Sequence, residues 1–145
     1  MAKKRVLFVC VHNSARSQMA EELLRKIAGD RFEVESAGLE PGVLNPHVIE
    51  VLKEEGIDIT GKKTKSAFDL FKAGRRYTYV ITVCDETSAE ACPVFPSCQE
   101  RFHWSFPDPS KFVGTDEQII EQVREIKNQI KARIEEWIKD RNSTS

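Results

Sequence analysis

The sequence lacks an excess of charge of either sign, because 22 lysine and arginine residues are balanced by 23 aspartate and glutamate residues. No overall field therefore favours nucleic acid or an anionic membrane as a partner. A long apolar run is also missing: the longest, residues 6–11, falls far short of the roughly 20 residues that span a bilayer. His12 and Asn13 interrupt this run, so the basic start of the chain is not expected to be a signal peptide. These absences predict a cytoplasmic protein that binds neither nucleic acid nor membrane.

Internal repeats, low-complexity segments and Ser/Gly linkers are absent as well. The 145 residues suit one domain, and a domain of this size buries about 70% of the surface of its unfolded chain, so it needs no disulfide or metal for stability. We predict a single domain over residues 1–140, a short polar tail over residues 141–145, and a monomer. The four cysteines need another explanation, because in a reducing compartment cysteines are more often catalytic, metal-binding or buried than bridged.

Apolar runs and helical periodicity alternate along the chain. Runs rich in β-branched and aromatic residues predict strands over residues 5–10, 32–36, 77–83 and 101–106. Apolar residues at helical spacing predict helices over residues 17–27, 46–56 and 66–71 and a long final helix from residue 115. This order predicts an α/β three-layer sandwich, with a four-stranded, mainly parallel sheet flanked by helices.

The junction of the first strand and first helix holds a thiol, Cys10, and a guanidinium, Arg16, with five residues between them. A loop at the carboxyl end of a parallel strand faces the ligand crevice, and the following helix offers unpaired amides to an anion. The same field favours the thiolate of Cys10, and the Ser17 hydroxyl is expected to hydrogen-bond its sulfur. The alternative is a buried apolar Cys10 beside a solvated Arg16. The groups expected to bind a tetrahedral oxyanion are the Arg16 side chain and the loop amides of Val11, His12, Asn13, Ser14, Ala15, Arg16 and Ser17.

Residues 6–10 and 13–21 resemble the P-loop of the low-molecular-weight protein tyrosine phosphatase superfamily. The resemblance extends to residue 138 and implies the phosphatase-like fold of that superfamily. One branch removes phosphate from tyrosine. The other, the thioredoxin-coupled arsenate reductases, uses the same loop to take arsenate.

The other cysteines favour the arsenate branch, because reduction of As(V) needs two electrons that thiols can supply. Cys84 ends the third predicted strand and is expected at the same sheet edge as Cys10. Attack of Cys84 on the Cys10 sulfur would release arsenite, and attack of Cys92 on Cys84 would then regenerate Cys10. Residues 83–93 and 103–109 resemble the redox segment and closing strand of the reductases. This resemblance implies thioredoxin as the final reductant, although the sequence does not exclude a glutaredoxin system.

Asp108 follows the last predicted strand, where the superfamily places its general acid. The alternative is an ordinary Asp-Pro turn. The phosphatase branch usually has tyrosine after this acid, whereas Ser110 follows Pro109 here. The sequence therefore offers no aromatic side chain at this place to flank a phosphotyrosine.

Two departures from the reductase pattern leave alternatives open. Relatives often carry a further cysteine where this chain has Ala15, and Cys98 is an extra cysteine that could resolve the disulfide in place of Cys92. We prefer Cys92 because proline follows it. The intervals between Cys84, Cys92, Cys98 and His103 lack the close Cys-x2-Cys pair of structural zinc sites, so no metal is expected.

Asn13 and Ser36 resemble positions that brace the P-loop in the family. In some members these residues, with Glu21 and a further acidic residue, hold a potassium ion. Ser66 stands in the place of that acid, which argues against potassium, and we expect no cofactor. Asn13 and Ser36 are therefore interpreted as braces of the loop.

The sequence favours an arsenate reductase with phosphate and sulfate as competing oxyanions. A phosphatase acting through a Cys10 phosphoenzyme would need Arg16 and Asp108 but not Cys84 or Cys92. A binding module without turnover would need neither the thiols nor Asp108. Some phosphatase activity can accompany reduction, because arsenate and phosphate share shape and charge.

Overall fold

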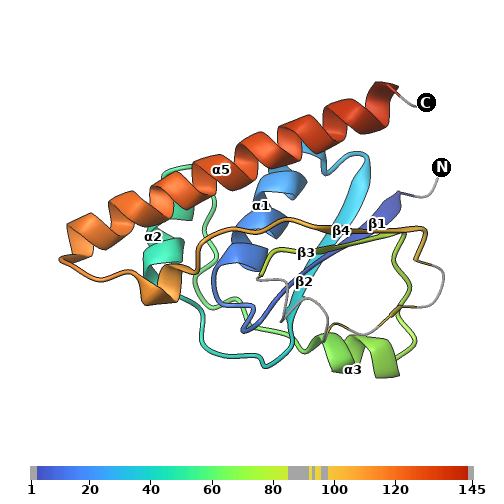
Figure 1. The fold of residues 1–145 in the computed structure, drawn as a ribbon, viewed down its shortest axis with the longest axis horizontal. Helices are drawn as coiled ribbons and strands as arrows, with labels where there is room; N and C mark the ends of the chain where they lie inside the picture. The colour runs from blue at the N-terminus through green and yellow to red at the C-terminus, as the bar shows by residue number, and fades with distance from the viewer. Residues whose placement is uncertain (1–2, 85–91, 93, 96–97, 144–145) are drawn as a thin grey trace.

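The computed structural model describes residues 3–84, 92, 94–95 and 98–143 (Figure 1). The elements in chain order are β1 (Lys4–Cys10), α1 (Arg16–Ala28), β2 (Phe32–Gly38), α2 (Pro46–Lys53), α3 (Ala67–Lys72), β3 (Tyr79–Thr82), β4 (Glu100–His103), the 3-10 helix η1 (Pro109–Lys111) and α5 (Asp116–Ser143). The sequence predicts every one of these except η1. Helix α5 reaches Ser143, so residues 141–143 of the predicted tail are helical, and residues 144–145 lie outside the described part of the chain.

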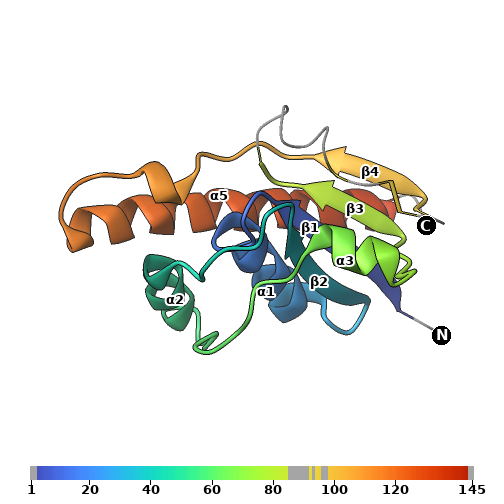
Figure 2. The same cartoon turned by 90° about the horizontal axis from the view of Figure 1, so that it is seen from below.

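The four strands form one sheet in the order β2-β1-β3-β4, and every pairing is parallel (Figure 2). Parallel pairing brings the carboxyl ends of the strands to one edge: Cys10 pairs with Gly38, and Val9 pairs with Thr82. The structure confirms the predicted parallel sheet. Strand β4 ends at His103 rather than at residue 106, because β3, its only described neighbour, ends at Thr82 and the last bond between them is Trp104 N to Thr82 O, 2.8 Å.

Side chains of the central strand β1 alternate between two apolar layers. Val6, Phe8 and Cys10 belong to the core beneath α1, α2 and α5, whereas Leu7 and Val9 belong to the core on the face that carries α3. Figure 1 shows α5 and α3 on opposite sides of the sheet. The buried stripe of α5 is core, as its periodicity predicts, and comprises Val123, Ile126, Ile130, Ile134 and Trp137. Burial on both faces explains why β1 is an unbroken apolar run.

Helix starts in this fold follow from capping residues. Asn45 accepts hydrogen bonds from the amides of His47 and Val48, with Pro46 in the first turn, and Ser66 accepts from the amide of Asp69. Helix α1 differs, because Ala15 precedes it and no side chain caps its first amides. Those amides remain available to a ligand. Among the described residues, no helix is both long enough and apolar enough to cross a bilayer.

Candidate active site

The loop between β1 and α1 is held open by hydrogen bonds from outside it. Four backbone amides of residues 39–45 donate to carbonyl oxygens of the loop. These bonds are Leu39 N to Cys10 O (3.1 Å), Glu40 N to Val11 O (2.7 Å), Gly42 N to His12 O (2.9 Å) and Asn45 N to Ser14 O (3.0 Å). Because these carbonyls point outward to residues 39–45, the peptide N–H groups between them point to the inside of the loop. Asn13 completes the curl with a left-handed backbone, φ 55°. A ring of inward amides at an uncapped helix start is a nest for an oxyanion.

Gly38, which ends β2, lies directly against this loop. A Cβ at this position would stand 2.8 Å from the backbone atoms Asn13 N, His12 C and Val11 O. Backbone cannot rotate aside as a side chain can, so only glycine fits here. The sequence alone does not predict this contact, since nothing local to residue 38 reveals its distance from residues 11–13.

Gly38→Ala is therefore expected to displace the loop and to lower the free energy of unfolding by about 1 to 3 kcal/mol. Urea denaturation checks the stability, and phosphate binding by calorimetry checks the loop. Gly42→Ala is the matched control, because its Cβ would meet only the His12 side chain, at 3.3 Å. Equal phosphate binding in Gly38→Ala and the unaltered protein would contradict the close approach.

The Cys10 sulfur lies at the floor of the loop and is 3% exposed. The amide of Asn13 donates to it at 3.2 Å, and Ser17 Oγ lies 2.8 Å from it. Ser17 Oγ also accepts a bond from Asn13 Nδ2 at 2.8 Å, and its hydroxyl can donate to the sulfur. The sulfur thus lies within hydrogen-bond distance of one backbone amide of the loop and one hydroxyl of α1.

Arg16 extends from the start of α1 toward the segment that follows β4. Its Nη1 donates to Phe106 O at 3.1 Å, and its Nη2 lies 3.8 Å from Asp108 Oδ2. The residue is only 7% exposed, so its position is well defined by packing. Arg16, at the end of the loop that follows Cys10, therefore meets Asp108 although 92 positions separate them in the chain.

Asp108 is ionised in the unliganded site. Burial alone would raise its pKa, but hydrogen bonds from the amide and hydroxyl of Ser110 and the charges of Arg16 and Lys111 bring the pKa below its ordinary value. Asp108 Oδ1 accepts from Ser110 N at 2.9 Å and from Ser110 Oγ at 2.8 Å. A bound oxyanion would add negative charge and engage Arg16, and both changes raise the pKa of Asp108 toward that of a proton donor.

Asn13 and Ser36 connect the loop to the buried carboxylate of Glu21. Asn13 Nδ2 donates to Ser36 Oγ at 2.9 Å, and Ser36 Oγ donates to Glu21 Oε1 at 2.5 Å. Gln18, which the sequence analysis did not single out, joins this group through bonds from its Nε2 to Asn13 O (3.0 Å) and Asn13 Oδ1 (3.1 Å). No local signal in the sequence identifies Gln18, because its complete burial results from tertiary packing.

The side-chain oxygens of Asn13 and Ser36 do not fit a potassium ion, because other groups already occupy them. The amide of Lys65 and Gln18 Nε2 already occupy Asn13 Oδ1, and Ser36 points its hydrogen at Glu21. Ser66 serves as the cap of α3. Among the described residues, no group of three or more His, Cys, Asp or Glu side chains is arranged to hold a metal.

The remaining loop positions differ in exposure. His12 is exposed, and its Nδ1 lies 2.8 Å from Glu40 O, so its ring is outside the loop. Val11 and Ser14 are half-buried, and Ala15 is buried against the core at 4% exposure. These residues can therefore serve the oxyanion through backbone amides, as the sequence analysis expects.

All four cysteines are thiols in this structure. Cys10 and Cys84 lie in the same apolar core, at the carboxyl ends of the paired strands β1 and β3, where Val83 N donates to Val9 O at 2.8 Å. Cys92 lies in the other core, on the opposite face of β1, and Cys98 packs against that core. The predicted redox segment falls partly on residues 85–91 and 93, which are outside the described residues.

The Cys92 thiol is held in its neutral form. Burial raises its pKa, the charge of Arg101 opposes this, and the neighbouring Cys98 raises the pKa further. Cys98 is half-buried, and its Sγ donates to Glu100 O at 3.3 Å. The structure therefore places Cys10 and Cys84 in the same core and Cys92 in the core on the other face of the sheet.

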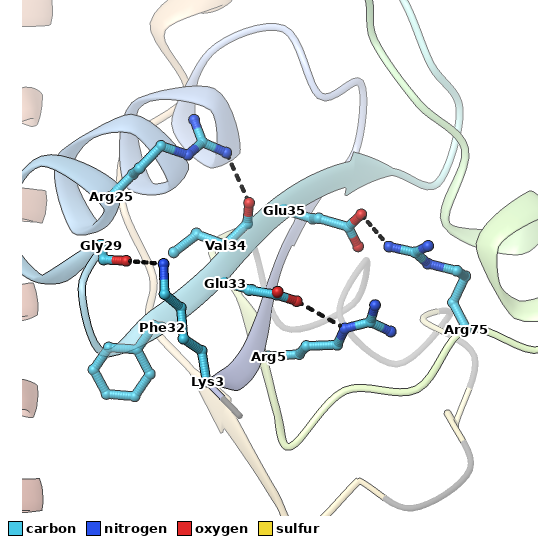
Figure 3. A pocket seen from close by; sticks show the side chains of 9 residues that line it. All are labelled: Lys3, Arg5, Arg25, Gly29, Phe32, Glu33, Val34, Glu35 and Arg75. Atoms are coloured by element: carbon cyan, nitrogen blue, oxygen red, sulfur yellow. Dashed lines mark hydrogen bonds and ion pairs between the residues drawn. The ribbon is translucent and has the colours of Figure 1, made fainter. Parts of the chain in front are cut away.

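A separate cavity lies beside the edge strand β2 (Figure 3). Its lining residues are Lys3, Arg5, Arg25, Gly29, Phe32, Glu33, Val34, Glu35 and Arg75. Arg5 pairs with Glu33 at 3.1 Å, and Arg75 pairs with Glu35 at 2.5 Å. The cavity is lined by the first halves of β1 and β2 and lies away from the strand ends at Cys10 and Gly38. It is therefore not the oxyanion site.

Comparison with known proteins places the chain in a family. The family described as "Low molecular weight phosphotyrosine protein phosphatase" matches residues 5–143. A protein named arsenate reductase from Halalkalibacterium halodurans is 41% identical over 134 residues, covering 92% of this chain and 94% of the relative. An arsenate reductase from Bacillus subtilis is 34% identical and covers 94% and 96%.

Solved structures agree with this grouping. An arsenate reductase in the phosphate binding state is 32% identical, with a TM-score of 0.73 over 94% of this chain and 98% of that one. A thioredoxin-dependent arsenate reductase from Corynebacterium glutamicum is 32% identical, with a TM-score of 0.69 over 99% of this chain and 64% of that one. A tyrosine phosphatase from T. tengcongensis has a TM-score of 0.74, with coverage of 95% and 99%, but 24% identity, so it shows the fold alone. The chain belongs to the low molecular weight phosphotyrosine protein phosphatase family, and its sequence groups it with the arsenate reductases of that family.

Proposed function

We propose that the chain reduces arsenate to arsenite with its own thiols. The observation that carries this proposal is the pairing of Cys10, under the oxyanion loop, with Cys84 in the same core at the end of the adjacent strand. A phosphatase has no use for a second thiol there. The names of the relatives, including one called thioredoxin-dependent, support the same conclusion.

The first step joins sulfur to arsenic. Arsenate binds to the inward-pointing N–H groups of the loop, and the planar guanidinium of Arg16 binds two of its oxygens. The Cys10 thiolate attacks the arsenic, and one hydroxyl group of the arsenate takes a proton from Asp108 and leaves as water. Phosphate and sulfate would occupy the same amides and compete.

The second step carries the electrons. The Cys84 thiolate attacks the Cys10 sulfur, a sulfur–sulfur bond forms, and the pair of the sulfur–arsenic bond stays on arsenic, which leaves as arsenite. Cys92 then attacks the Cys84 sulfur and frees the Cys10 thiolate. An external dithiol, thioredoxin in this proposal, reduces the Cys84–Cys92 disulfide. We place this cycle in the cytoplasm and assign it to a monomer without a cofactor.

Cys92 must leave its apolar core to reach Cys84, because the two residues lie in different cores on the two faces of the sheet. In the resting enzyme, its burial and raised pKa keep it from attacking early. Formation of the Cys10–Cys84 disulfide would therefore precede this movement.

Cys84→Ser tests the function. We expect NADPH consumption with arsenate, thioredoxin and thioredoxin reductase to fall to background, because no second thiol releases arsenite. Hydrolysis of p-nitrophenyl phosphate, which needs only Cys10, Arg16 and Asp108, would change less than about twofold. If the unaltered protein hydrolyses the phosphate ester but never consumes NADPH, the chain is a phosphatase. If it binds arsenate with neither activity, it is a binding module. If arsenate reduction is sustained by a glutaredoxin system and not by thioredoxin, glutaredoxin is the reductant.

A further inference from the structure

A chain of polar side chains connects the Cys10 sulfur to a lysine that no step above uses. From the sulfur it passes through Ser17, Asn13 and Ser36 to Glu21, each link being a hydrogen bond of 2.5 to 2.9 Å. Its far end is Lys62, whose Nζ lies 2.9 Å from Glu21 Oε2. Loop position and carboxylate charge are therefore physically coupled.

The Glu21 carboxylate is 3% exposed and needs a cation to remain ionised. Burial raises its pKa, but the charge of Lys62, followed by hydrogen bonds from Ser36, Lys62 and Arg25, brings the pKa below its ordinary value. Arg25 also contacts Glu21 Oε2, at 2.5 Å. Both cations also contact Glu22, but the Arg25 side chain is 45% exposed against 23% for Lys62, and Arg25 donates in addition to Val34 O. Lys62 is the better shielded partner.

The oxygen atoms around the Lys62 ammonium group are already bound to other donors. Glu21 directs one oxygen to Ser36 and the other to Lys62 and Arg25. A potassium ion would have to displace the ammonium group and break these bonds. The chain thus disagrees with a potassium-dependent site.

We propose that Lys62 is the built-in cation of this site: its ammonium group holds the Glu21–Ser36–Asn13 brace and thereby keeps the oxyanion loop in its binding form without potassium. Lys62 is a positioning residue, since its ammonium group contacts Glu21 and Glu22 and lies at the far end of the brace from Cys10. The effect on arsenate turnover rests on the proposed function. The effect on the loop does not, because any oxyanion reports it.

The experiment measures how phosphate protects Cys10 from iodoacetamide, read by mass spectrometry of the peptide that contains Cys10. Lys62→Ala removes the charge and leaves room for an ion, and Lys62→Met removes the charge but fills the space. Lys62→Arg retains the charge. Lys63→Met is the matched control, because Lys63 is the next residue and is exposed.

In choline chloride, Lys62→Ala and Lys62→Met are expected to need about 10-fold more phosphate for half-protection, as is usual when a group behind a binding site is lost. Potassium chloride at the same ionic strength should restore protection in Lys62→Ala and not in Lys62→Met. The unaltered protein, Lys62→Arg and Lys63→Met should respond equally in both salts. Arsenate kcat/KM, where reduction is observed, should follow the same pattern.

Two results would overturn the proposal. One is unaltered protein whose phosphate protection improves threefold or more in potassium chloride, a measurement that requires no variant to fold. The other is normal protection of a folded Lys62→Met in choline chloride. Because neither depends on arsenate turnover, a chain that proves to be a phosphatase would leave this test intact.

Discussion

Cys92→Ser is expected to release one arsenite per chain and then stop. The Cys10–Cys84 pair can complete a single cycle, but without Cys92 the disulfide remains on Cys10, so sustained NADPH consumption should fall by about 100-fold or more. A rapid-quench measurement of arsenite from stoichiometric enzyme should show a burst near that of the unaltered protein. A normal burst of arsenite without sustained NADPH consumption would show that Cys92→Ser loses regeneration of the Cys10 thiol and not the reduction of arsenate itself.

Cys98→Ser is the matched control for this result, since Cys98 packs against the same core as Cys92 and is half-buried. We expect its steady-state rate to change less than about twofold, as for a surface thiol outside the relay. If instead Cys98→Ser stops after one turnover and Cys92→Ser does not, Cys98 is the resolving thiol. Serine preserves the shape of the side chain at both positions, and the melting temperature of each variant reveals any folding defect, to which the buried Cys92 is more sensitive than the half-buried Cys98.

The loop and the sheet could be predicted from the sequence because local patterns specify them. A doubly buried strand is an apolar run, and the strand-to-helix junction follows directly with Cys10 and Arg16 at its two ends. Parallel topology then brings Cys84 to the edge that holds Cys10, so order along the chain was sufficient to place both thiols.

Long-range partners could not be predicted in the same way. Lys62 meets Glu21 across 41 positions, and Gly38 meets the loop across the sheet, through contacts that exist only after the layers pack. The face on which Cys92 rests is a further example, because the sequence between Cys84 and Cys92 shows no periodicity that would assign it to a core. The chemistry of disulfide exchange predicts a role for a third thiol, but only tertiary packing determines that Cys92 lies in the core on the other face of the sheet.

Asp108→Asn is expected to lower the single-turnover rate of arsenite formation by about 100- to 1,000-fold with little change in KM, because asparagine keeps the shape but donates no acidic proton. The sign of the pH dependence follows from the same role. A general acid must be protonated, so the rate of the unaltered enzyme should fall as pH rises through the pKa of Asp108 in the arsenate complex. In Asp108→Asn this alkaline limb should be absent.

Ser110→Ala separates the proton donor from the groups that set its acidity. The Ser110 hydroxyl donates to Asp108 Oδ1 at 2.8 Å and helps to hold the pKa of Asp108 below its ordinary value. Its removal leaves the backbone bond from Ser110 and the charge of Arg16, so the pKa of Asp108 should rise and the alkaline limb should move to higher pH. The maximal rate should stay within about threefold, because the acid itself remains. An Asp108→Asn variant with the rate and pH profile of the unaltered enzyme would instead assign Asp108 to the turn that begins η1, where it also caps the first amides.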